Sequence, residues 1–446
     1  MGGTLVVTVD APPSGHAITA NRWDRLDGVR PDPLPTVSVI VVHFEQQPQL
    51  DRTLLALERQ SYPRHLLEVI VVDDGSRTAP TVPAGVRLLR QEDRGFRAAA
   101  ARNAGAGVAH GRILCFLDAD TTPEPDYVME VARLPSLAAD AVTVGLRRHA
   151  NLAAAPVDDR IEVVGPALEL PAPEWLSRAY DRTGDLLEVD HRSYRYLIGA
   201  VLACSRAFFD ETGGFDESFT DYGGEDWEWG YRAWLAGAIF AYVRSAVAWH
   251  DGPEWSARPD ADDSRQRRKN GEALRLARSI PATGSSGRGL WSHTADVVIE
   301  IRSSSSPAAL YICVDSILEA VPHAVVVLPD SSLDSVIDDP RVVSRADAVG
   351  HPLARVTVDV HRPLKVDPEL FRLEVERVAS GCGDAADIVA RDHSGAVLIE
   401  IRSQRARRRR ARWKRDELFP THDVVAEWIV ALNNEPDLEA YLGGWS

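Results

Sequence analysis

The sequence contains few cysteines and no long apolar run. Its four cysteines lie far apart among 446 residues, and none forms the C-x-x-C pair typical of zinc and redox sites. This excludes a disulfide framework and a structural zinc site, and it fits a reducing compartment. No apolar stretch approaches the roughly 18 residues that a membrane-spanning helix needs, and no basic segment followed by an apolar run opens the chain. We therefore expect a cytoplasmic protein without a signal peptide or membrane span.

Positive charge is scarce relative to negative charge. The chain has 50 Lys and Arg residues against 66 Asp and Glu residues, a net charge of −16. Because a phosphate backbone would be repelled, duplex nucleic acid is excluded as a partner of the whole molecule. One basic stretch, "RSQRARRRRARWKR" at 402–415, departs from this balance. We expect a solvated helix face there, with weak contact to an anionic membrane surface as the alternative.

Continuous β-branched runs alternate with helical patterns from residue 37 onward. "VSVIVVHF", "LEVIVVDDGS" and "RILCFLDADTTPEPD" have the composition of strands buried on both faces, and the segments between them have helical spacing. This order predicts an α/β fold with a mostly parallel, Rossmann-like sheet flanked by helices. Ligands of such sheets bind at the carboxyl ends of the strands. Four carboxylates are expected at that edge: Asp73, Asp74, Asp118 and Asp120.

The second half of the chain partly repeats the first. "ADVVIEIRSSSSPAALYICVDSILEAVPHAVVVLPDSS" mimics the opening strand–helix–strand, but "LPDSS" stands where "VDDGS" stood and "VDVHRP" where "LDADTT" stood. Two interpretations stay open: any two α/β units look alike, or the second half is a degenerate copy that has lost the paired acids. The predicted domains are 1–35 (an N-terminal extension), 36–256 (the domain with the acids), 257–289 (a helix and linker) and 290–446 (a non-catalytic α/β domain that supports homodimerisation or acceptor docking).

Two acidic motifs at the predicted strand ends suggest metal and nucleotide binding. In "FLDAD", two acids stand two residues apart at the end of a predicted strand. One can meet a ribose hydroxyl while the other holds Mg or Mn, which prefer oxygen ligands and substrate phosphates. In "VVDDGS", a carboxylate can accept from a base or ribose, with a plain Asp/Gly turn as the alternative. His250, at the end of "SAVAWHDG", is a candidate third metal ligand.

The stretch "DYGGEDWEWGYR" places two glycines and two acids before an aromatic helix. Glu225 and Asp226 occupy the predicted first turn, where negative charge is favoured by the helix dipole. Helix capping is one interpretation of these acids, and a general base aimed at an acceptor is the other. One face of the helix carries apolar side chains, which predicts core packing: Trp227, Tyr231, Trp234 and Leu235.

Together these motifs resemble the nucleotide-sugar glycosyltransferases of the GT-A fold, especially family 2, over about residues 36–256. The matching pieces are "VSVIVVHFE", "VVDDGS", "RGFRAAAARNAG", "FLDAD" and "GGFDESFTDYGGEDWEWGYRAWLAGA", closing on "WH". The resemblance implies that Asp120 and His250 hold a divalent cation, Mn or Mg. It implies that Asp226 is the base of an inverting enzyme, with Glu225 orienting the attacking group. The residues implied in nucleotide binding are Phe44, Asp73, Asp74, Arg102, Asn103 and Asp118.

The resemblance thus implies a metal-dependent inverting glycosyltransferase. Such an enzyme moves a sugar from a nucleotide-sugar donor, with UDP as the usual nucleotide, to a hydroxyl or thiol of a saccharide, natural-product or peptide acceptor. Glu45 stands where Asn is common in the family, so contacts to the donor base are expected to differ. "DYGGED" also resembles the retaining polypeptide N-acetylgalactosaminyltransferases, which show G-G-E-N there and D-x-H for the other motif. A retaining enzyme of that kind and a non-catalytic nucleotide-sugar-binding scaffold stay open as alternatives.

Overall fold

The computed structural model describes residues 13–220, 223–253, 262–292, 294–329, 337–345, 350–381 and 387–444. The chain divides into two compact units, which are described separately. The first unit comprises Met1–Trp234 and Ala238–Arg275, and the second comprises Leu235–Gly237 and Leu276–Ser446. Cys382, Asp221 and Tyr222, which belong to motifs discussed above, lie outside the described residues.

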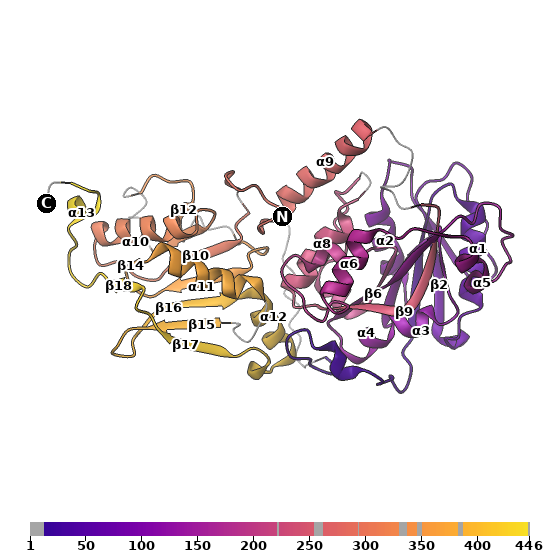
Figure 1. Ribbon diagram of the computed structural model, residues 1–446, viewed down its shortest axis with the longest axis horizontal. Helices are drawn as coiled ribbons and strands as arrows, with labels where there is room; N and C mark the ends of the chain where they lie inside the picture. Colours follow the sequence, from indigo (N-terminus) through magenta and orange to yellow (C-terminus); the bar gives the residue numbers. More distant parts are fainter. Residues whose placement is uncertain are drawn as a thin grey trace. The chain divides into compact units, whose positions relative to one another are not determined.

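The first unit is built on one sheet that is parallel except at three short strands (Figure 1). β8, β5 and β7 run antiparallel to their neighbours, and the other strands run in one direction. This confirms the mostly parallel α/β fold predicted from the sequence. In spatial order the strands are β3 (Arg87–Arg90), β2 (Leu67–Asp73), β1 (Val37–His43), β4 (Ile113–Asp118), β8 (Val201–Ser205), β6 (Ala141–Ala150), β9 (Ile239–Asp251) and β5 (Thr121–Pro123), with β7 (Glu169–Leu170) beside β6.

The central strands are fully buried because helices cover both faces of the sheet. Val39, Ile40 and Val41 of β1 are each 0% exposed. The Ala- and Gly-rich helix after β3 packs especially closely, since a Cβ at its Gly105 would lie 2.5 Å from an Ile40 methyl carbon. The helices are α1 (Gln47–Glu58), α2 (Ala98–Val108), α3 (Tyr127–Val131), α4 (Arg133–Leu137), α5 (Ile161–Ala167), α6 (Glu174–Arg182), α7 (Arg206–Glu211), α8 (Glu225–Leu235) and α9 (Asp262–Ser279), with 3-10 turns η1 (Trp23–Leu26), η2 (Arg64–Leu66) and η3 (Ser193–Tyr196).

The second unit has its own sheet and core. Leu310, Val358 and Phe371 lie in one apolar cluster between the sheet and its helices. The strands are, in spatial order, β12 (Val342–Ser344), β11 (Val325–Leu328), β10 (Val297–Ile301), β13 (Val356–Val360), β16 (Val397–Ser403), β15 (Asp387–Arg391) and β17 (Thr421–Val425), with β14 (Leu364–Val366) paired to β18 (Ile429–Ala431). The helices are α10 (Pro307–Ala320), α11 (Pro368–Ser380), α12 (Gln404–Trp413) and α13 (Leu438–Tyr441), with a 3-10 turn η6 (Asp416–Leu418).

The two sheets share the order and direction of seven strands, from β3 to β9 in the first and from β12 to β17 in the second. In the first unit, β1 pairs in parallel with β2 and β4, and β4 pairs with the antiparallel β8. In the second unit, β10 pairs in parallel with β11 and β13, and β13 pairs with the antiparallel β16. The strand on the far side of β8 is β6, and that on the far side of β16 is β15, so in both units it comes earlier in the chain. Ser205 ends β8 opposite Ile113, and Ser403 ends β16 opposite Val356, and both serines cap the helix that follows. The sheet of the second unit therefore repeats most of the first unit's sheet, which favours a degenerate copy among the two interpretations that the sequence left open.

The register identifies the residues that stand in the second unit where the two acids of "FLDAD" would be. When Val356 is matched to Ile113, His361 takes the position of Asp118 and Pro363 that of Asp120. Nor do the described residues between β12 and β13 form a helix, whereas α2 lies at that point of the first unit. The residues that would match Asp73 and Asp74 lie outside the described residues.

The basic stretch at 402–415 differs from the solvated helix face expected. Arg409 on α12 is 0% exposed and lies over the Phe419 ring, with its guanidinium carbon 5.4 Å from the ring centroid. Arg410 donates to Asp387 and to the Phe419 carbonyl oxygen. Exposed arginines remain at Arg407 and Arg408, so only part of the stretch faces solvent. Within the described residues, no helix has both the length and the apolar character needed to span a membrane.

Candidate active site

The first acidic motif is anchored at the ends of β1 and β2. The strand register sets Asp73 beside His43, and the Asp73 carboxylate accepts from His43 Nδ1 at 2.9 Å and from Arg90 Nε at 2.8 Å. His43 Nε2 accepts from the Gln46 N–H at 3.1 Å, so Nδ1 carries the ring proton. Burial raises the pKa of Asp73, but hydrogen bonds from Ser76, His43 and Arg90 outweigh it and lower the pKa overall. Asp73 is 0% exposed, so in this geometry it fixes the loop and turns no oxygen toward solvent.

Asp74 holds the next loop against the same edge. Its carboxylate accepts from the Arg97 N–H at 2.8 Å and from the Gln91 amide, and burial raises its pKa. Gly75 has a φ of +91°, and a Cβ there would lie 2.4 Å from the Asp93 nitrogen, so only glycine fits. Phe44, directly after β1, is 47% exposed and is the open aromatic surface of this edge.

The two acids of "FLDAD" point to different partners because β4 ends at Asp118 and the chain turns before Asp120. The backbone between them is fixed, because the Ala119 N–H donates to the Val42 carbonyl oxygen and Thr53 Oγ1 donates to the Ala119 carbonyl oxygen, each at 2.8 Å. Asp118 accepts from Arg102 Nη2 at 3.0 Å. Asp120 instead faces the end of β9.

Asp120 and His250 form a pair that fits one cation. Asp120 Oδ2 lies 3.6 Å from His250 Nε2, and neighbouring ligands about 2.1 Å from an octahedral Mn or Mg lie roughly 3.0 Å apart, so a shift of about 0.6 Å would bring both side chains onto one cation. The Gly252 carbonyl oxygen lies 3.1 Å from His250 Nδ1 and can accept its proton, which leaves the Nε2 lone pair toward Asp120. Burial raises the pKa of Asp120 and lowers that of His250, because it disfavours the charged form of each side chain. A bound cation would stabilise the ionised Asp120 and the neutral His250.

The remaining ligands of such a cation are not supplied by the described residues. No group of three or more His, Cys, Asp or Glu side chains within them is arranged to hold a metal ion. A protein that provides two ligands leaves the other positions to water and substrate phosphates, as is usual for Mg.

Arg102 joins the two acidic motifs through its buried guanidinium. It is 3% exposed, and besides Asp118 it donates from Nη1 to Glu225 Oε1 at 2.7 Å. Burial lowers its pKa, but the two carboxylates outweigh this and raise it well above the usual value. A Cβ at Gly199 would lie 2.9 Å from the Arg102 Cζ, so glycine there makes room for the guanidinium. Its neighbour Asn103 bonds both the N–H and the carbonyl oxygen of Phe215, and so anchors that loop.

The adjacent acids at the start of α8 have different surroundings. Glu225 is 6% exposed and held by Arg102, although the sequence interpretation gave it the task of orienting the acceptor. Asp226 is half-buried and accepts from the Gly199 N–H at 3.1 Å and the Trp227 N–H at 2.9 Å. Burial, followed by the charge of Glu225, raises the pKa of Asp226 to about 7. Asp226 is therefore the acid whose proton affinity suits a base at neutral pH.

The aromatic side chains of α8 pack in the core, as predicted. Tyr231 and Trp234 are 0% and 2% exposed, and Trp227 is only half-buried. Trp229, outside the predicted stripe, is also fully buried and donates from its indole N–H to Thr212 Oγ1 at 3.0 Å. Since the helix is buried on more than one side, the start of α8 is rigidly placed.

Sequence reasoning missed several residues that shape this site. His43 and Arg90 donate hydrogen bonds to Asp73, and Gly199 contacts both Arg102 and Asp226. His43 could have been noticed, because it stands at a strand end one residue before Phe44. The sequence around Gly199, "LIGA", does not indicate its role. The side chains that it contacts, Arg102 and Asp226, belong to helices far away in the chain.

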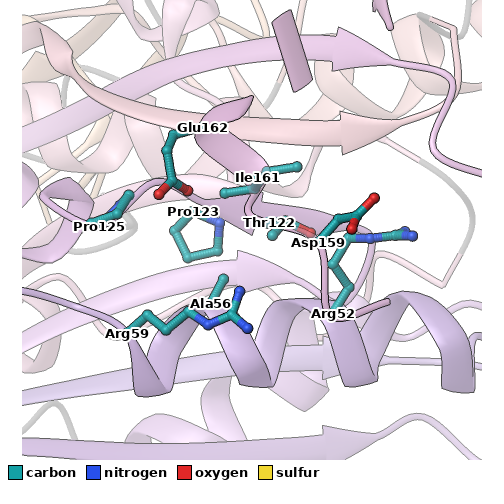
Figure 2. Close-up of a pocket in the computed structure, with 9 residues that line it drawn as sticks. All are labelled: Arg52, Ala56, Arg59, Thr122, Pro123, Pro125, Asp159, Ile161 and Glu162. Carbon is teal, nitrogen blue, oxygen red and sulfur yellow. The ribbon is translucent and has the colours of Figure 1, made fainter. Parts of the chain in front are cut away.

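A small hollow elsewhere in the first unit is not the site. Figure 2 shows it between Arg52 and Arg59 of α1 and the acids Asp159 and Glu162. Its volume is about 10 Å³, room for roughly one water molecule. The Arg52 guanidinium is already bound to backbone carbonyl oxygens, at 2.7 Å from that of Ala155.

Comparisons with known proteins agree with this geometry. Residues 38–162 match the family model "Glycosyl transferase family 2", and residues 187–247 match "N-terminal domain of galactosyltransferase". Hyaluronan synthase of Pasteurella multocida is 28% identical over 242 residues, covering 49% of this chain and 24% of that protein. Validoxylamine A glucosyltransferase of Streptomyces hygroscopicus subsp. limoneus is 33% identical over 221 residues, covering 45% and 48%. The chain thus spans less than half the length of either relative.

A solved mannosyltransferase of Pyrobaculum calidifontis, in complex with GDP-Man and Mn²⁺, has a TM-score of 0.41 at 20% identity, covering 60% of this chain and 70% of that one. The family match itself extends over β1 to β6 and so includes the "DDGS" and "FLDAD" acids. The second match extends over β8, α8 and most of β9 and includes Glu225 and Asp226. The first unit is therefore similar to family 2 glycosyltransferases over the residues that carry both acidic motifs.

Proposed function

We propose that the first unit transfers a sugar from a nucleotide-sugar donor to a hydroxyl or thiol of a saccharide, natural-product or peptide acceptor, with inversion at the anomeric carbon. The observation that carries this proposal is the Arg102 guanidinium, bound to Asp118 on one side and to Glu225 on the other. This guanidinium bonds Asp118, at the sheet edge proposed to bind the donor, and Glu225, in the acid pair proposed to bind the acceptor. UDP as the nucleotide rests on the family resemblance alone.

The donor edge is assigned as follows. Phe44 offers its exposed ring to the base, and Asp118, whose side chain is 37% exposed, accepts from the nucleoside. Asp74 is buried with both oxygens bonded to neighbouring groups, and it shapes the loop of this edge. Asp73 and Asn103 act indirectly, since their polar atoms already hold neighbouring loops. Asp120 and His250 hold Mn or Mg, which when bound supplies positive charge for the departing nucleoside diphosphate.

Asp226 is assigned as the base. Its carboxylate accepts the proton of the attacking hydroxyl while that oxygen forms the bond to the anomeric carbon. The bond from that carbon to the phosphate oxygen breaks, and the electron pair leaves with the nucleoside diphosphate. Attack opposite to the leaving group inverts the configuration. A pKa of about 7 lets Asp226 be ionised and still hold a proton firmly. The second unit is given no transfer step, because His361 and Pro363 replace the two acids.

The test is release of nucleoside diphosphate from a panel of nucleotide-sugars by the full chain, with Mn²⁺ and with excess EDTA. We expect release from at least one donor, lost in EDTA and lost in Asp120→Asn. Asp159→Asn, an exposed acid away from the site, is the matched control and should keep the parental rate. Full activity in EDTA would remove the cation from the proposal, and no release from any donor would favour the scaffold alternative.

A further inference from the structure

A third carboxylate reaches the acceptor side of the site from α9. Glu272 is half-buried, and its side chain lies against the glycine pair that leads into α8. A Cβ at Gly223 would lie 3.1 Å from Glu272 Cδ and Oε2, and one at Gly224 would lie 3.3 Å from its Cγ. Both glycines have a φ of +95°, so the close approach and the backbone turn each require glycine. Glu272 therefore sits directly beside the start of the acid pair.

Among the described residues, the carboxylates at this point outnumber the positively charged side chains that are hydrogen-bonded to them. Glu225 Oε1 is bound by Arg102, but its Oε2 is buried and has no hydrogen-bond partner among the described residues. Asp226 accepts only from backbone N–H groups. Glu272 makes no hydrogen bond or ion pair with any residue that the structure describes. Arg102 is shared with Asp118, so one guanidinium serves several acids.

The three acids also influence one another electrostatically. Burial, followed by the charge of Glu225, raises the pKa of Glu272, and Glu272 contributes to raising that of Asp226. Lys269, one turn earlier on α9, favours ionised Glu272 but is the weakest of the influences on it. A positive charge between the acids would therefore stabilise the ionised form of each.

The described residues favour an ammonium group over a metal ion as the cation that these acids would bind. Among the described residues, no three acids or histidines are gathered closely enough to hold a metal. An ammonium group, by contrast, reaches separate carboxylates through N–H bonds of about 2.8 Å each. It also offers three donors, enough for an unpaired buried oxygen and two further acceptors.

We propose that Glu272 determines acceptor specificity, and that it joins Glu225 Oε2 and Asp226 in selecting an acceptor that carries a protonated amino group. This inference rests on the function proposed above, since it names the chemical class of the acceptor for the same site. Neutral polyols can also bind carboxylates, but they would leave the excess negative charge unbalanced.

The experiment uses the full chain, its best donor from the panel, and three acceptor probes at pH 7: methyl glucoside, methyl glucosaminide and N-acetylated methyl glucosaminide. The readout is the concentration of each probe that half-maximally changes nucleoside diphosphate release, whether it stimulates transfer or blocks the site. We expect the amine to act at a concentration roughly tenfold to a hundredfold lower than the other two, the worth of one hydrogen bond to a charged group.

Glu272→Gln should reduce that preference by about tenfold, because one charge is lost while the shape is kept. Glu272→Lys should abolish it and favour methyl glucuronide instead. Glu58→Gln, the same change at an exposed acid on α1, should leave it unchanged. The inference would be overturned if the amine and the neutral probes acted at equal concentrations or if the amine had no effect. It would also be overturned if the preference for the amine survived in both Glu272 variants. Donor release without any probe reports separately on the proposed function.

Discussion

Replacing Asp226 by Asn should make the protein less active and more stable at once. Asn keeps the shape of the side chain but cannot take up the proton of the attacking group. Transfer should therefore fall by about 10²–10⁴-fold, the usual contribution of a positioned base. Donor binding should survive, because Asp74, Asp118 and Asp120 are untouched.

The gain in stability follows from the raised pKa of Asp226, about 7 in the folded chain against an ordinary 3.8. Below about pH 4 both states hold the proton, and the side chain carries no ionisation cost. As pH rises the unfolded chain ionises first, so folding loses stability until the folded carboxyl ionises near pH 7. Three pKa units correspond to an upper limit of about 4 kcal/mol above that pH. Asn carries no such cost but gives up one accepting oxygen, worth about 1 kcal/mol.

We therefore expect Asp226→Asn to be more stable than the parent by roughly 1–3 kcal/mol at pH 8, with the difference shrinking by about 2 kcal/mol at pH 5. Urea unfolding followed by tryptophan fluorescence reports on this region, since Trp229 and Trp234 are buried in α8. Asp159→Asn controls for the loss of one charge. A variant less stable than the parent at both pH values would refute the reasoning and make Asp226 an ordinary helix-capping acid.

Further predictions concern the rest of the site. Because Asp226 must be ionised, kcat/KM should rise with pH through about 7 and then level off; a rate independent of pH from 5 to 9 would contradict its role. Arg102→Met should destabilise the first unit by about 3–5 kcal/mol, since it leaves Glu225 buried and unpaired; urea midpoints that match the parent would contradict this. The full chain with both Asp120→Asn and Asp226→Asn should show no donor turnover, and parental turnover would place activity in the second unit.

The sheet and its acidic edge were predictable because their signals are local. β1, β2 and β4 are continuous apolar runs that end in acids, and parallel pairing brings those ends together whatever follows. The Asp120–His250 pair was predicted from the family resemblance, and the structure brings the two side chains together. The repeat in the second half was visible in sequence, but the strand register was needed to show that it includes seven strands of the sheet.

Other features depend on contacts that no local pattern encodes. Asp73 reads as an exposed loop acid, yet His43 and Arg90 bury it, and Arg90 lies on another strand. Glu272 reads as one charge on a polar helix, and only the fold sets it against Gly223. The arginines of α12 likewise read as a solvated face, although Arg409 packs on an aromatic ring. In each case a distant partner decides whether the charge is exposed.

The most direct measurement of the central claim, that Asp226 acts as the base of an inverting transfer, is the anomeric configuration of the first-formed product. Proton NMR during the reaction reads the coupling at the transferred anomeric carbon, with the donor's own coupling as reference. The account predicts a configuration opposite to that of the donor, and no product at all on the same timescale from Asp226→Asn. A product with the donor's configuration would contradict it and support the retaining alternative.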